Sequence, residues 1–265
     1  MRLLTIASGS SGNSTYVGDD ETHILVDAGV SKKRIEEGLN SADISVKDLS
    51  GILITHEHSD HIQSLGVLAR KYGIPIYATA GTLDYILHSS SMGKIDPGLC
   101  KVIKADSELE IGSLTVHPFS IPHDAAEPVG YRISSEDTSV AVSTDIGHCS
   151  EYLIDNLKGL KALLIEANHD VRMLEAGPYP YYLKRRILSD VGHMSNETCG
   201  RLLCEVLNDA MKYVILGHLS KENNYPDLAY ESVRCEIHEN SCSYEPDDFD
   251  IRVASRDMPG QVLTV

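Results

Sequence analysis

The first half of the chain alternates short apolar runs with polar or glycine-rich turns. Runs of this length are typical of buried strands, and they predict strands at residues 3–6, 15–17, 23–26, 51–55 and 74–77. The strands at 15–17 and 23–26 are expected to form a hairpin, because a Gly-Asp-Asp turn follows the first of them. A helical pattern begins after Ser31, a residue type favoured at N-caps, and a second helix is expected at 62–72.

The second half contains more strands, followed by helical patterns. Strands are expected at 108–111, 114–120, 130–135, 139–143, 161–165 and 213–216, and helices at 181–189, 196–208 and 228–239. Strands in both halves, with helices between them, fit two sheets packed face to face and covered by helices. No repeat or long linker interrupts the pattern, so we expect one α/β domain over residues 1–265. The tail, 239–265, shows only an acidic run at 245–250, expected as a solvated loop, and at most one edge strand.

The composition is that of a globular protein with a sizeable core. The 265 residues are 42% hydrophobic and 23% charged. The apolar runs are far shorter than a membrane-spanning helix requires, and the first residues do not form a signal peptide, so we expect no membrane association and a cytoplasmic location. The six cysteines show no Cys-x-x-Cys pair, which leaves a zinc ribbon or redox pair unsupported.

The net charge of −16 argues against a protein that binds nucleic acid over its whole surface, since phosphate repels an acidic field. It does not exclude a nuclease. Carboxylates that bind metal ions are themselves acidic, and the bound cations reverse the local charge.

Four metal-binding side chains lie within six residues, directly after the strand expected at 51–55. They are His56, His58, Asp60 and His61. Imidazoles two residues apart on extended backbone project to the same side, and imidazole with carboxylate is a donor set that zinc favours. A solvated loop that caps the next helix would be the alternative. Burying these groups together is costly unless something satisfies them, so the cluster favours a metal site.

Three more polar residues each follow an expected strand: His123, Asp145 and His218. Any one of them alone is more typical of a hydrogen-bonded turn. Together with the cluster at 56–61, they supply the remaining ligands that a metal centre needs, and we interpret all seven residues as its ligands.

The order of these residues resembles the metallo-β-lactamase superfamily, whose signature is His-x-His-x-Asp-His followed by a distant His, then Asp, then His. The resemblance implies an αββα sandwich and two divalent metal ions per chain, zinc or alternatively manganese. It assigns one ion to His56, His58, His123 and Asp145, and the other to Asp60, His61, Asp145 and His218. Asp27 matches the superfamily's Asp-x-Gly and is expected to orient a ligand imidazole, although a plain turn would also explain it.

Two further segments resemble motifs of phosphodiester-cleaving members of the superfamily. Glu166 and His193 match a pair from the transfer-RNA-processing nucleases, in which a glutamate orients a histidine at the scissile phosphate. Residues 7–14, 143–148 and 177–186 are similar to the YycJ/WalJ-like group, regarded as DNA exonucleases linked to repair. That resemblance implies attack by a hydroxide bridging the two metals, with Asp60 balancing metal charge and His148 lining the site.

The densest basic stretch, 179–186, interleaves tyrosines with cations, which can stack on bases and hold phosphates. The substrate-binding candidates are Tyr182, Lys184, Arg185, Arg186 and Ser195. An amphipathic helix with a solvated basic face is the alternative for the stretch, and a helix N-cap is the alternative for Ser195.

The chain is therefore expected to be a nuclease that acts on DNA. The main alternative is a hydrolase of small esters, thioesters or lactones on the same two-metal site, and a second is a metal-binding module without catalysis. The choice between DNA and RNA, the polarity of cleavage and the oligomeric state stay open.

Overall fold

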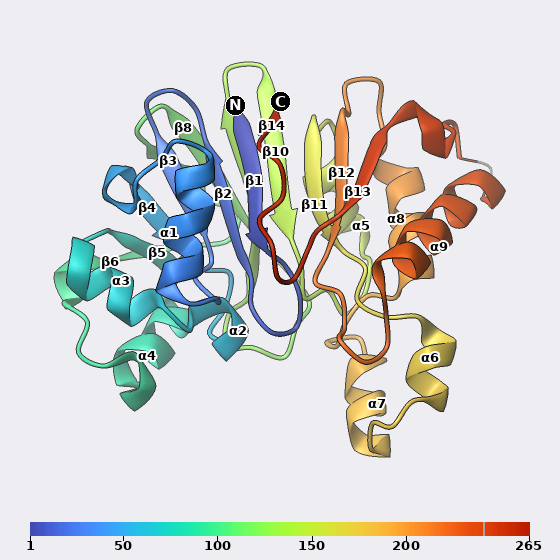
Figure 1. Cartoon of the computed structure of the whole chain (residues 1–265), viewed down its shortest axis with the longest axis horizontal. Coiled ribbons are helices and arrows are strands. Elements are labelled where there is room, and N and C mark those ends of the chain that lie inside the picture. Colours follow the sequence, from blue (N-terminus) through green and yellow to red (C-terminus); the bar gives the residue numbers. More distant parts are fainter. Residues whose placement is uncertain (241) are drawn as a thin grey trace.

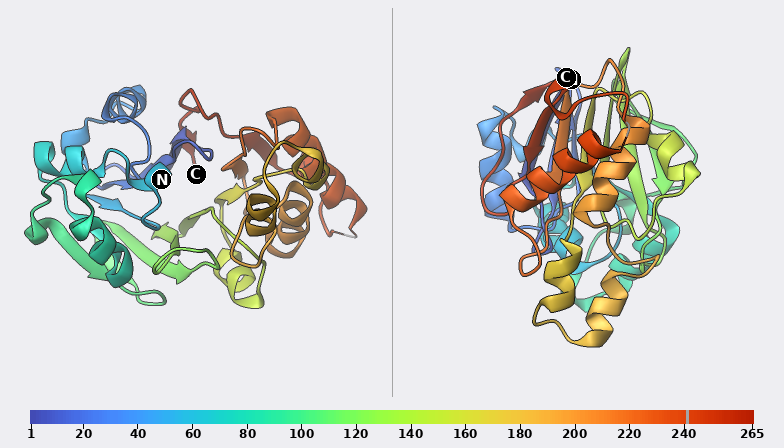
Figure 2. Two further views of the ribbon diagram at one scale, coloured as in Figure 1. Left: turned by 90° about the horizontal axis from the view of Figure 1, so that it is seen from below. Right: turned by 90° about the vertical axis from the view of Figure 1, so that its right-hand side faces the viewer.

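The computed structural model describes residues 1–240 and 242–265, and it contains two seven-stranded mixed sheets packed face to face (Figure 1). Figure 2 shows that the two halves of the chain form separate layers, with helices on the outside of each. The predicted αββα sandwich is confirmed. The N- and C-termini lie side by side, because the last strand, β14, pairs with the first, β1, with Leu263 opposite Leu3.

The first sheet uses the first hundred residues and the last strand. In spatial order its strands are β14 (Leu263–Thr264), β1 (Arg2–Ala7), β2 (Ser14–Gly18), β3 (His23–Val26), β4 (Gly51–Leu53), β5 (Ile76–Thr79) and β6 (Cys100–Ile103). The strands β3 to β6 run parallel. The hairpin predicted at 15–26 is confirmed as the antiparallel pair β2–β3.

The second sheet begins with an antiparallel meander and ends with parallel strands. Its spatial order is β13 (Asp250–Val253), β12 (Tyr213–Gly217), β11 (Ala162–Glu166), β10 (Thr138–Ser143), β9 (Val129–Ser135), β8 (Leu114–Ser120) and β7 (Leu109–Ile111). The strands β10 to β13 run parallel.

Alternation of side chains along the strands explains the layers. In β1, Leu4 and Ile6 pack under the helices, whereas Leu3 packs between the two sheets. The helices over the first sheet are α1 (Lys32–Ser41), α3 (Leu65–Tyr72) and α4 (Ala80–His88), and those over the second are α5 (Glu151–Leu157), α8 (Asn196–Val206) and α9 (Pro226–Glu239). Among the described residues, no helix combines the length and apolarity needed to cross a membrane.

Several predicted elements are corrected by the structure. The helix predicted at 62–72 is two helices, α2 (Ser59–Ile62) and α3, because the Ser64 amide and hydroxyl donate to the carbonyls of Ala28 and Val30. The sequence prediction missed α4, β6, α5 and α6 (Val171–Ala176). The tail contributes two edge strands, one to each sheet, and the acidic run predicted as a loop contains a short 3₁₀ helix at Pro246–Asp248.

Three loop segments interlock through backbone hydrogen bonds beside α2. The Asn13 amide donates to the Asp60 carbonyl, and the Gly29 amide donates to the Asn13 carbonyl, each at 2.8 Å. A Cβ atom at Gly29 would lie 1.6 Å from the Asp60 carbonyl oxygen, so only glycine permits this approach.

Gly29→Ala is therefore expected to lower the free energy of unfolding by about 2 kcal/mol or more, because backbone must move to admit the methyl group. Urea unfolding followed by circular dichroism measures the change. Gly98→Ala is the matched control, since its Cβ would meet no atom closer than 3.3 Å. Equal midpoints for both variants would contradict the proposed close packing.

Candidate metal centre

The candidate metal ligands gather at one edge of the sandwich, the lower edge in Figure 1, where α2 lies. Strands β3 and β4 of the first sheet run parallel, as do β10, β11 and β12 of the second, so their carboxyl ends share an edge within each sheet. The loops after these strands carry Asp27, the cluster at 56–61, Asp145 and His218, and Glu166 is the last residue of β11 (Ala162–Glu166). The site therefore lies at the seam between the two layers.

Left-handed backbone conformations turn three of these side chains at the strand ends. Asp27, Asp145 and His218 have φ angles of 61°, 62° and 54°. Non-glycine residues rarely adopt this region, and such strain persists only where the surrounding structure enforces it. Three residues around one site therefore adopt a strained backbone conformation that the surrounding structure enforces.

Three imidazoles form the first group of possible ligands. His58 Nδ1 lies 3.1 Å from His56 Nε2 and 3.2 Å from His123 Nε2. These three nitrogens can all lie within 4.8 Å of one another, a spacing at which one cation could contact all of them.

The second group contains Asp60, His61 and His218. The Nε2 atoms of His61 and His218 lie 3.5 Å and 3.4 Å from the same Asp60 carboxylate oxygen, Oδ2. Ligand atoms of these three residues also lie within 4.8 Å of one another.

Asp145 lies between the two groups and is 2% exposed. One of its oxygens lies 3.3 Å from His61 Nε2, and the other lies 3.4 Å from His218 Nε2 and 3.7 Å from His123 Nε2. Its Oδ2 atom has no hydrogen-bond partner among the described residues. A buried carboxylate oxygen without a partner is costly, and a cation between the two groups would satisfy it, so the residues present fit a metal centre.

The electrostatics couple these groups strongly. Burial opposes charge at His218, but the carboxylates of Asp145, Asp60 and Glu166 outweigh it and raise the pKa of His218 to about 10. The pKa of Asp145 is well below its usual value, because the surrounding imidazoles, His218 first, outweigh the burial that would raise it. In the metal-free protein, the cluster is therefore held together by buried ion pairs.

Asp27 supports the cluster from behind. Its Oδ2 atom lies 2.7 Å from His61 Nδ1, and its Oδ1 atom accepts from the Thr55 amide at 2.9 Å. The side-chain nitrogen of Asn13, Nδ2, lies 3.1 Å from His61 Nε2 and 3.4 Å from Asp60 Oδ2. Sequence reasoning missed Thr55 and Asn13; Thr55 precedes the histidine cluster directly, and Asn13 belongs to the Gly/Ser-rich loop at 8–14.

Glu166 and His193 form a second buried pair at the same site. Glu166 Oε1 lies 2.8 Å from His193 Nδ1 and 3.0 Å from His218 Nδ1, while Oε2 accepts from the amides of Ile146 and Met194. Although burial would raise it, the pKa of Glu166 is lowered to about 2, mainly by His193. Ligand atoms of Glu166 and His193 also lie within 4.8 Å of Asp145 and His218, so the geometry permits this group to hold a metal as well.

A cavity of about 290 Å³ opens over the cluster. Its lining residues are Ser10, His58, Ser59, Asp60, Asp145, Arg186, His193 and His218. Arg186 comes from α7 (Tyr181–Ile187), which projects below the body of the molecule with α6 (Figure 1), and its Nη2 donates to Asp124 at 2.7 Å. The ion pair with Asp124 holds the Arg186 guanidinium at the mouth of the cavity, whose other ionisable groups are carboxylates and imidazoles.

Other substrate-binding candidates lie elsewhere on α7 or in α8. Tyr182 is 75% exposed, the Lys184 ammonium donates to the Glu175 carbonyl, and Arg185 lies over the Tyr181 ring. Ser195 is buried and caps α8 by accepting from the Thr198 amide. The structure thus brings only Arg186 of the five candidates to the cavity.

His148, expected to line the site, is exposed instead. Its Nδ1 atom lies 3.0 Å from the Asp190 carbonyl, and it is absent from the residues that line the cavity. The backbone turns away after Ile146, whose amide is bound by Glu166.

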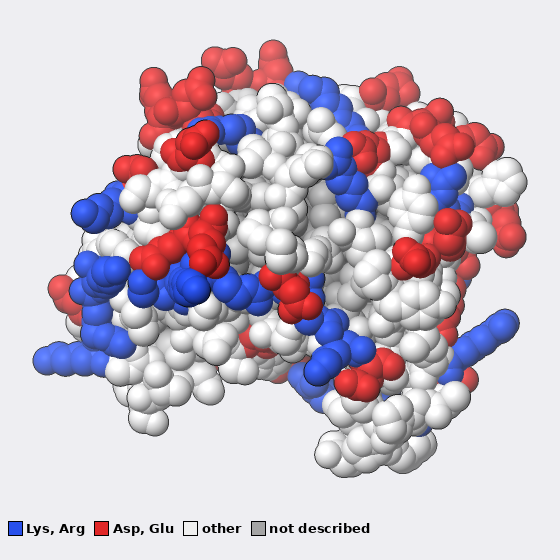
Figure 3. Space-filling view, in the orientation of Figure 1, with Lys and Arg blue, Asp and Glu red and all other residues white. Residues whose placement is uncertain are grey.

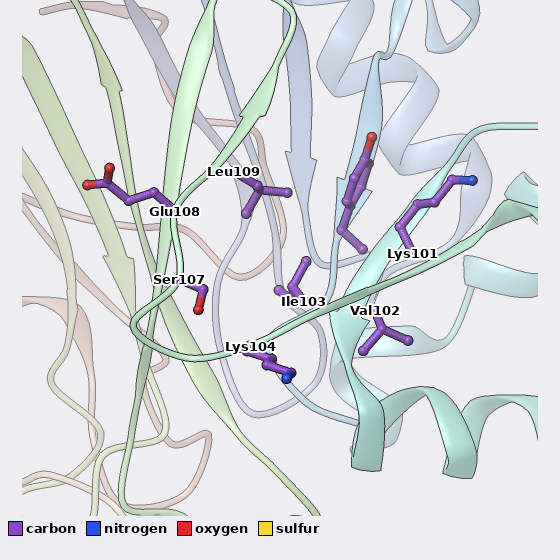
Figure 4. A pocket seen from close by; sticks show the side chains of 8 residues that line it. Lys101, Val102, Ile103, Lys104, Ser107, Glu108 and Leu109 are labelled. Atoms are coloured by element: carbon purple, nitrogen blue, oxygen red, sulfur yellow. The ribbon is translucent and has the colours of Figure 1, made fainter.

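A larger cavity, about 350 Å³, is lined by residues of β6 and β7 (Figure 4), and β6 lies at the opposite side of the molecule from α8 and α9 (Figure 1). It is lined by Tyr77, Lys101, Val102, Ile103, Lys104, Ser107, Glu108 and Leu109. It holds no group of metal-binding side chains, so the chemistry favours the smaller cavity as the reactive site.

The fold and the histidine–carboxylate cluster define a protein of the metallo-β-lactamase class. Residues 22–218 match the family described as "Beta-lactamase superfamily domain", and the chain belongs to that superfamily. It is 41% identical to exodeoxyribonuclease YycJ of Bacillus anthracis over 265 residues, 100% of this chain and 99% of that protein. It is 43% identical to exodeoxyribonuclease WalJ of Streptococcus pneumoniae (strain D39) over 225 residues, 85% of this chain and 84% of the other.

Two solved structures share the fold over their whole length. Zn²⁺-bound PqqB of Methylobacterium extorquens superposes with a TM-score of 0.73 at 18% identity, covering 100% of both chains. Human tRNase Z, short form, superposes with a TM-score of 0.67 at 15% identity, also covering 100% of both chains. At 18% and 15% sequence identity, these two similarities show a shared fold alone.

The pKa of His218 leads to a prediction about metal binding. An imidazole with a pKa of about 10 carries a proton at pH 7, and it must lose that proton before its nitrogen can bind a cation. Adding zinc to metal-free protein at pH 7 is therefore expected to release at least one proton, and the apparent affinity should rise with pH. Calorimetry in two buffers of different ionisation enthalpy measures the proton count; a count of zero would contradict the raised pKa.

Proposed function

We propose that the chain is a metal-dependent phosphodiesterase that degrades DNA as an exonuclease. The observation that carries the proposal is the Glu166–His193 pair, which is 2.8 Å apart and borders the carboxylate–imidazole cluster. The names of the relatives at 41% and 43% identity, both exodeoxyribonucleases, support DNA as the substrate.

The resident metals in this proposal are two divalent cations. His56, His58, His123 and Asp145 would hold one, and Asp60, His61, Asp145 and His218 the other. The nitrogen-rich donor set favours zinc, and the carboxylates also tolerate manganese. When bound, the ions would supply Lewis acidity toward the phosphodiester and toward the attacking water.

His193 acts on the phosphate in this mechanism. Glu166 holds its Nδ1 atom at 2.8 Å, which directs the other ring nitrogen, Nε2, toward the cavity. A protonated imidazole can donate to a phosphate oxygen as negative charge builds up, or protonate the leaving oxygen. Glu166 itself touches no substrate and acts as a positioning residue.

Arg186 supplies the substrate contact nearest to the cluster. Asp124 fixes one side of its guanidinium, and other N–H groups can donate to a phosphate at the mouth of the cavity. Four further substrate contacts stay predictions from the sequence: Tyr182, Lys184, Arg185 and Ser195. The same holds for His148 as a residue lining the site. The cytoplasmic location, the role in repair and the single-domain organisation are also predictions.

A small-molecule hydrolase is the second candidate. The cavity over the cluster is only about 290 Å³, and Lys184 and Arg185 do not line it. Such an enzyme would hydrolyse esters, thioesters or lactones with the same ligands and would not depend on the charge of α7.

Removal of one carboxylate ligand tests the metal centre. Asp60→Ala is expected to bind fewer metal ions and to lose about 1,000-fold or more in DNA cleavage, because several kcal/mol of transition-state stabilisation depend on the metals. End-labelled single- and double-stranded DNA, with metal content by mass spectrometry, measures both. Asp84→Ala, at a carboxylate 77% exposed on α4, is the control and should behave as the parent. Normal turnover in Asp60→Ala with one metal bound would refute the two-metal mechanism.

Removal of the proposed proton donor tests the phosphate chemistry. His193→Ala is expected to lower kcat on DNA by about 100-fold or more, as loss of a general acid does, with the metal content unchanged. A kcat within a few-fold of the parental value in His193→Ala would assign the proton transfer to another group.

A further inference from the structure

A second groove lies beside the metal cavity, on the far side of the loop that begins at Ser8. Its volume is about 310 Å³, which falls within the range of small-molecule sites and has room for about one nucleotide unit. The lining residues are Ser8, Leu219, Ser220, Lys221, Asn224, Tyr225, Pro226, Val253, Ala254, Ser255, Arg256 and Asp257. Apart from Ser8, which belongs to the segment 7–14, none of them was identified as a candidate from the sequence.

The groove and the metal cavity share two walls. Ser10 lines the metal cavity and Ser8 lines the groove, so the loop between them separates the two spaces. His218 lines the cavity and its neighbour Leu219 lines the groove, and the His218 amide donates to the Ser8 hydroxyl at 2.8 Å. The groove and the metal cavity therefore lie on either side of the same loop.

Two cations line the groove in a protein whose net charge is −16. Among the described residues, neither Lys221 nor Arg256 has a carboxylate within 4.0 Å, and Asp257 is the one acidic residue in the lining. Arg256 donates through Nη2 to the Leu219 carbonyl at 2.8 Å, which holds its guanidinium beside the loop. Figure 3 shows, on the face of the molecule seen in Figure 1, that Asp and Glu gather along the upper margin, whereas a band of Lys and Arg runs from the left margin to the lower centre with some carboxylates among them.

Glycine at position 9 permits this arrangement. A Cβ atom there would lie 3.0 Å from Arg256 Nε and 3.4 Å from the Leu219 carbonyl oxygen, so a side chain at position 9 would require the guanidinium to shift by a few tenths of an ångström. The Arg256 Nε atom is buried and has no hydrogen-bond partner among the described residues.

Tyr225 supplies an aromatic surface at the same groove. It is 52% exposed, directly before α9, and the apolar side chains of Pro226, Val253 and Ala254 complete the lining. An exposed aromatic ring beside unpaired cations is the combination with which proteins hold single-stranded nucleic acids: the ring stacks on a base and the cations hold the backbone.

We infer that this groove is a nucleotide subsite, in which the nucleotide adjoining the scissile phosphate stacks its base on Tyr225 while Lys221 and Arg256 hold its phosphate. The inference rests on the proposed nuclease function and adds to it a contact with the nucleotide next to the cleaved bond, whose base must be unpaired at that position to present its face to the ring.

The test compares a polymer with a substrate too small to reach the groove. Tyr225→Ala is expected to lower, by about tenfold, the ratio of kcat/KM on a single-stranded oligonucleotide to kcat/KM on bis(p-nitrophenyl) phosphate. Lys221→Gln should lower the same ratio and reduce the salt dependence of DNA binding by about one ion. Asp257→Asn should raise the ratio, because it removes the one carboxylate from the lining.

Two matched controls are available on the other half of the molecule. Tyr85→Ala removes a tyrosine that is 51% exposed on α4, and Lys101→Gln removes a cation on β6 that lines the separate cavity of Figure 4. Both controls should leave the ratio at the parental value.

Binding of labelled single-stranded DNA to metal-loaded protein, by fluorescence anisotropy, separates the two proposals. If the protein cleaves DNA but Tyr225→Ala and Lys221→Gln match their controls in both the kcat/KM ratio and DNA binding, the subsite is overturned and the nuclease proposal stands. Binding that depends on Tyr225 without any cleavage would support the subsite and overturn the nuclease. A protein that neither binds nor cleaves DNA would overturn both.

Discussion

The buried carboxylate of Asp145 is the constraint on which the rest of the site depends. It lies among the imidazoles of His61, His123 and His218, with one oxygen left without a hydrogen bond. An isolated buried carboxylate would take up a proton, yet the surrounding imidazoles lower its pKa well below the usual value. Positive charge around this carboxylate stabilises the arrangement, and it can come from protonated imidazoles or from a cation held by the neighbouring groups of possible ligands.

The ligands come from both layers, so the packing between the sheets sets the distances at the site. The cluster at 56–61 belongs to the first sheet, and His123, Asp145 and His218 belong to the second. Leu53 of β4 and Val142 of β10 lie in the apolar core between the sheets, a few residues before the ligands that follow each strand. Because packed interiors barely deform, this core keeps the two sets of ligands within a few ångströms without any crosslink.

The sequence predicted which imidazoles and carboxylates gather at the candidate metal centre better than it predicted the residues around them. The candidate ligands have a local signature, a strand followed by imidazole or carboxylate, and the structure brings all seven side chains together. The basic stretch on α7 has no such signature: Lys184 and Arg185 turn to other partners, and only Arg186 reaches the cavity. Short helices such as α4 and α6 were missed because nine and six residues contain too few apolar positions to show a helical period.

What the sequence determined by itself is therefore the chemistry: the residue types, their order, and the strand ends on which they lie. Tertiary structure alone decided which side chains complete the site. Thr55 and Asn13 support the histidines, Ser195 caps a helix instead of facing the cavity, and Tyr225, Lys221 and Arg256 line one groove although the chain separates Arg256 from Tyr225 by a long helix and a strand. The physical reason is that a ligand motif is local in the chain, whereas a cavity is made by segments that only the packing of the two sheets brings together.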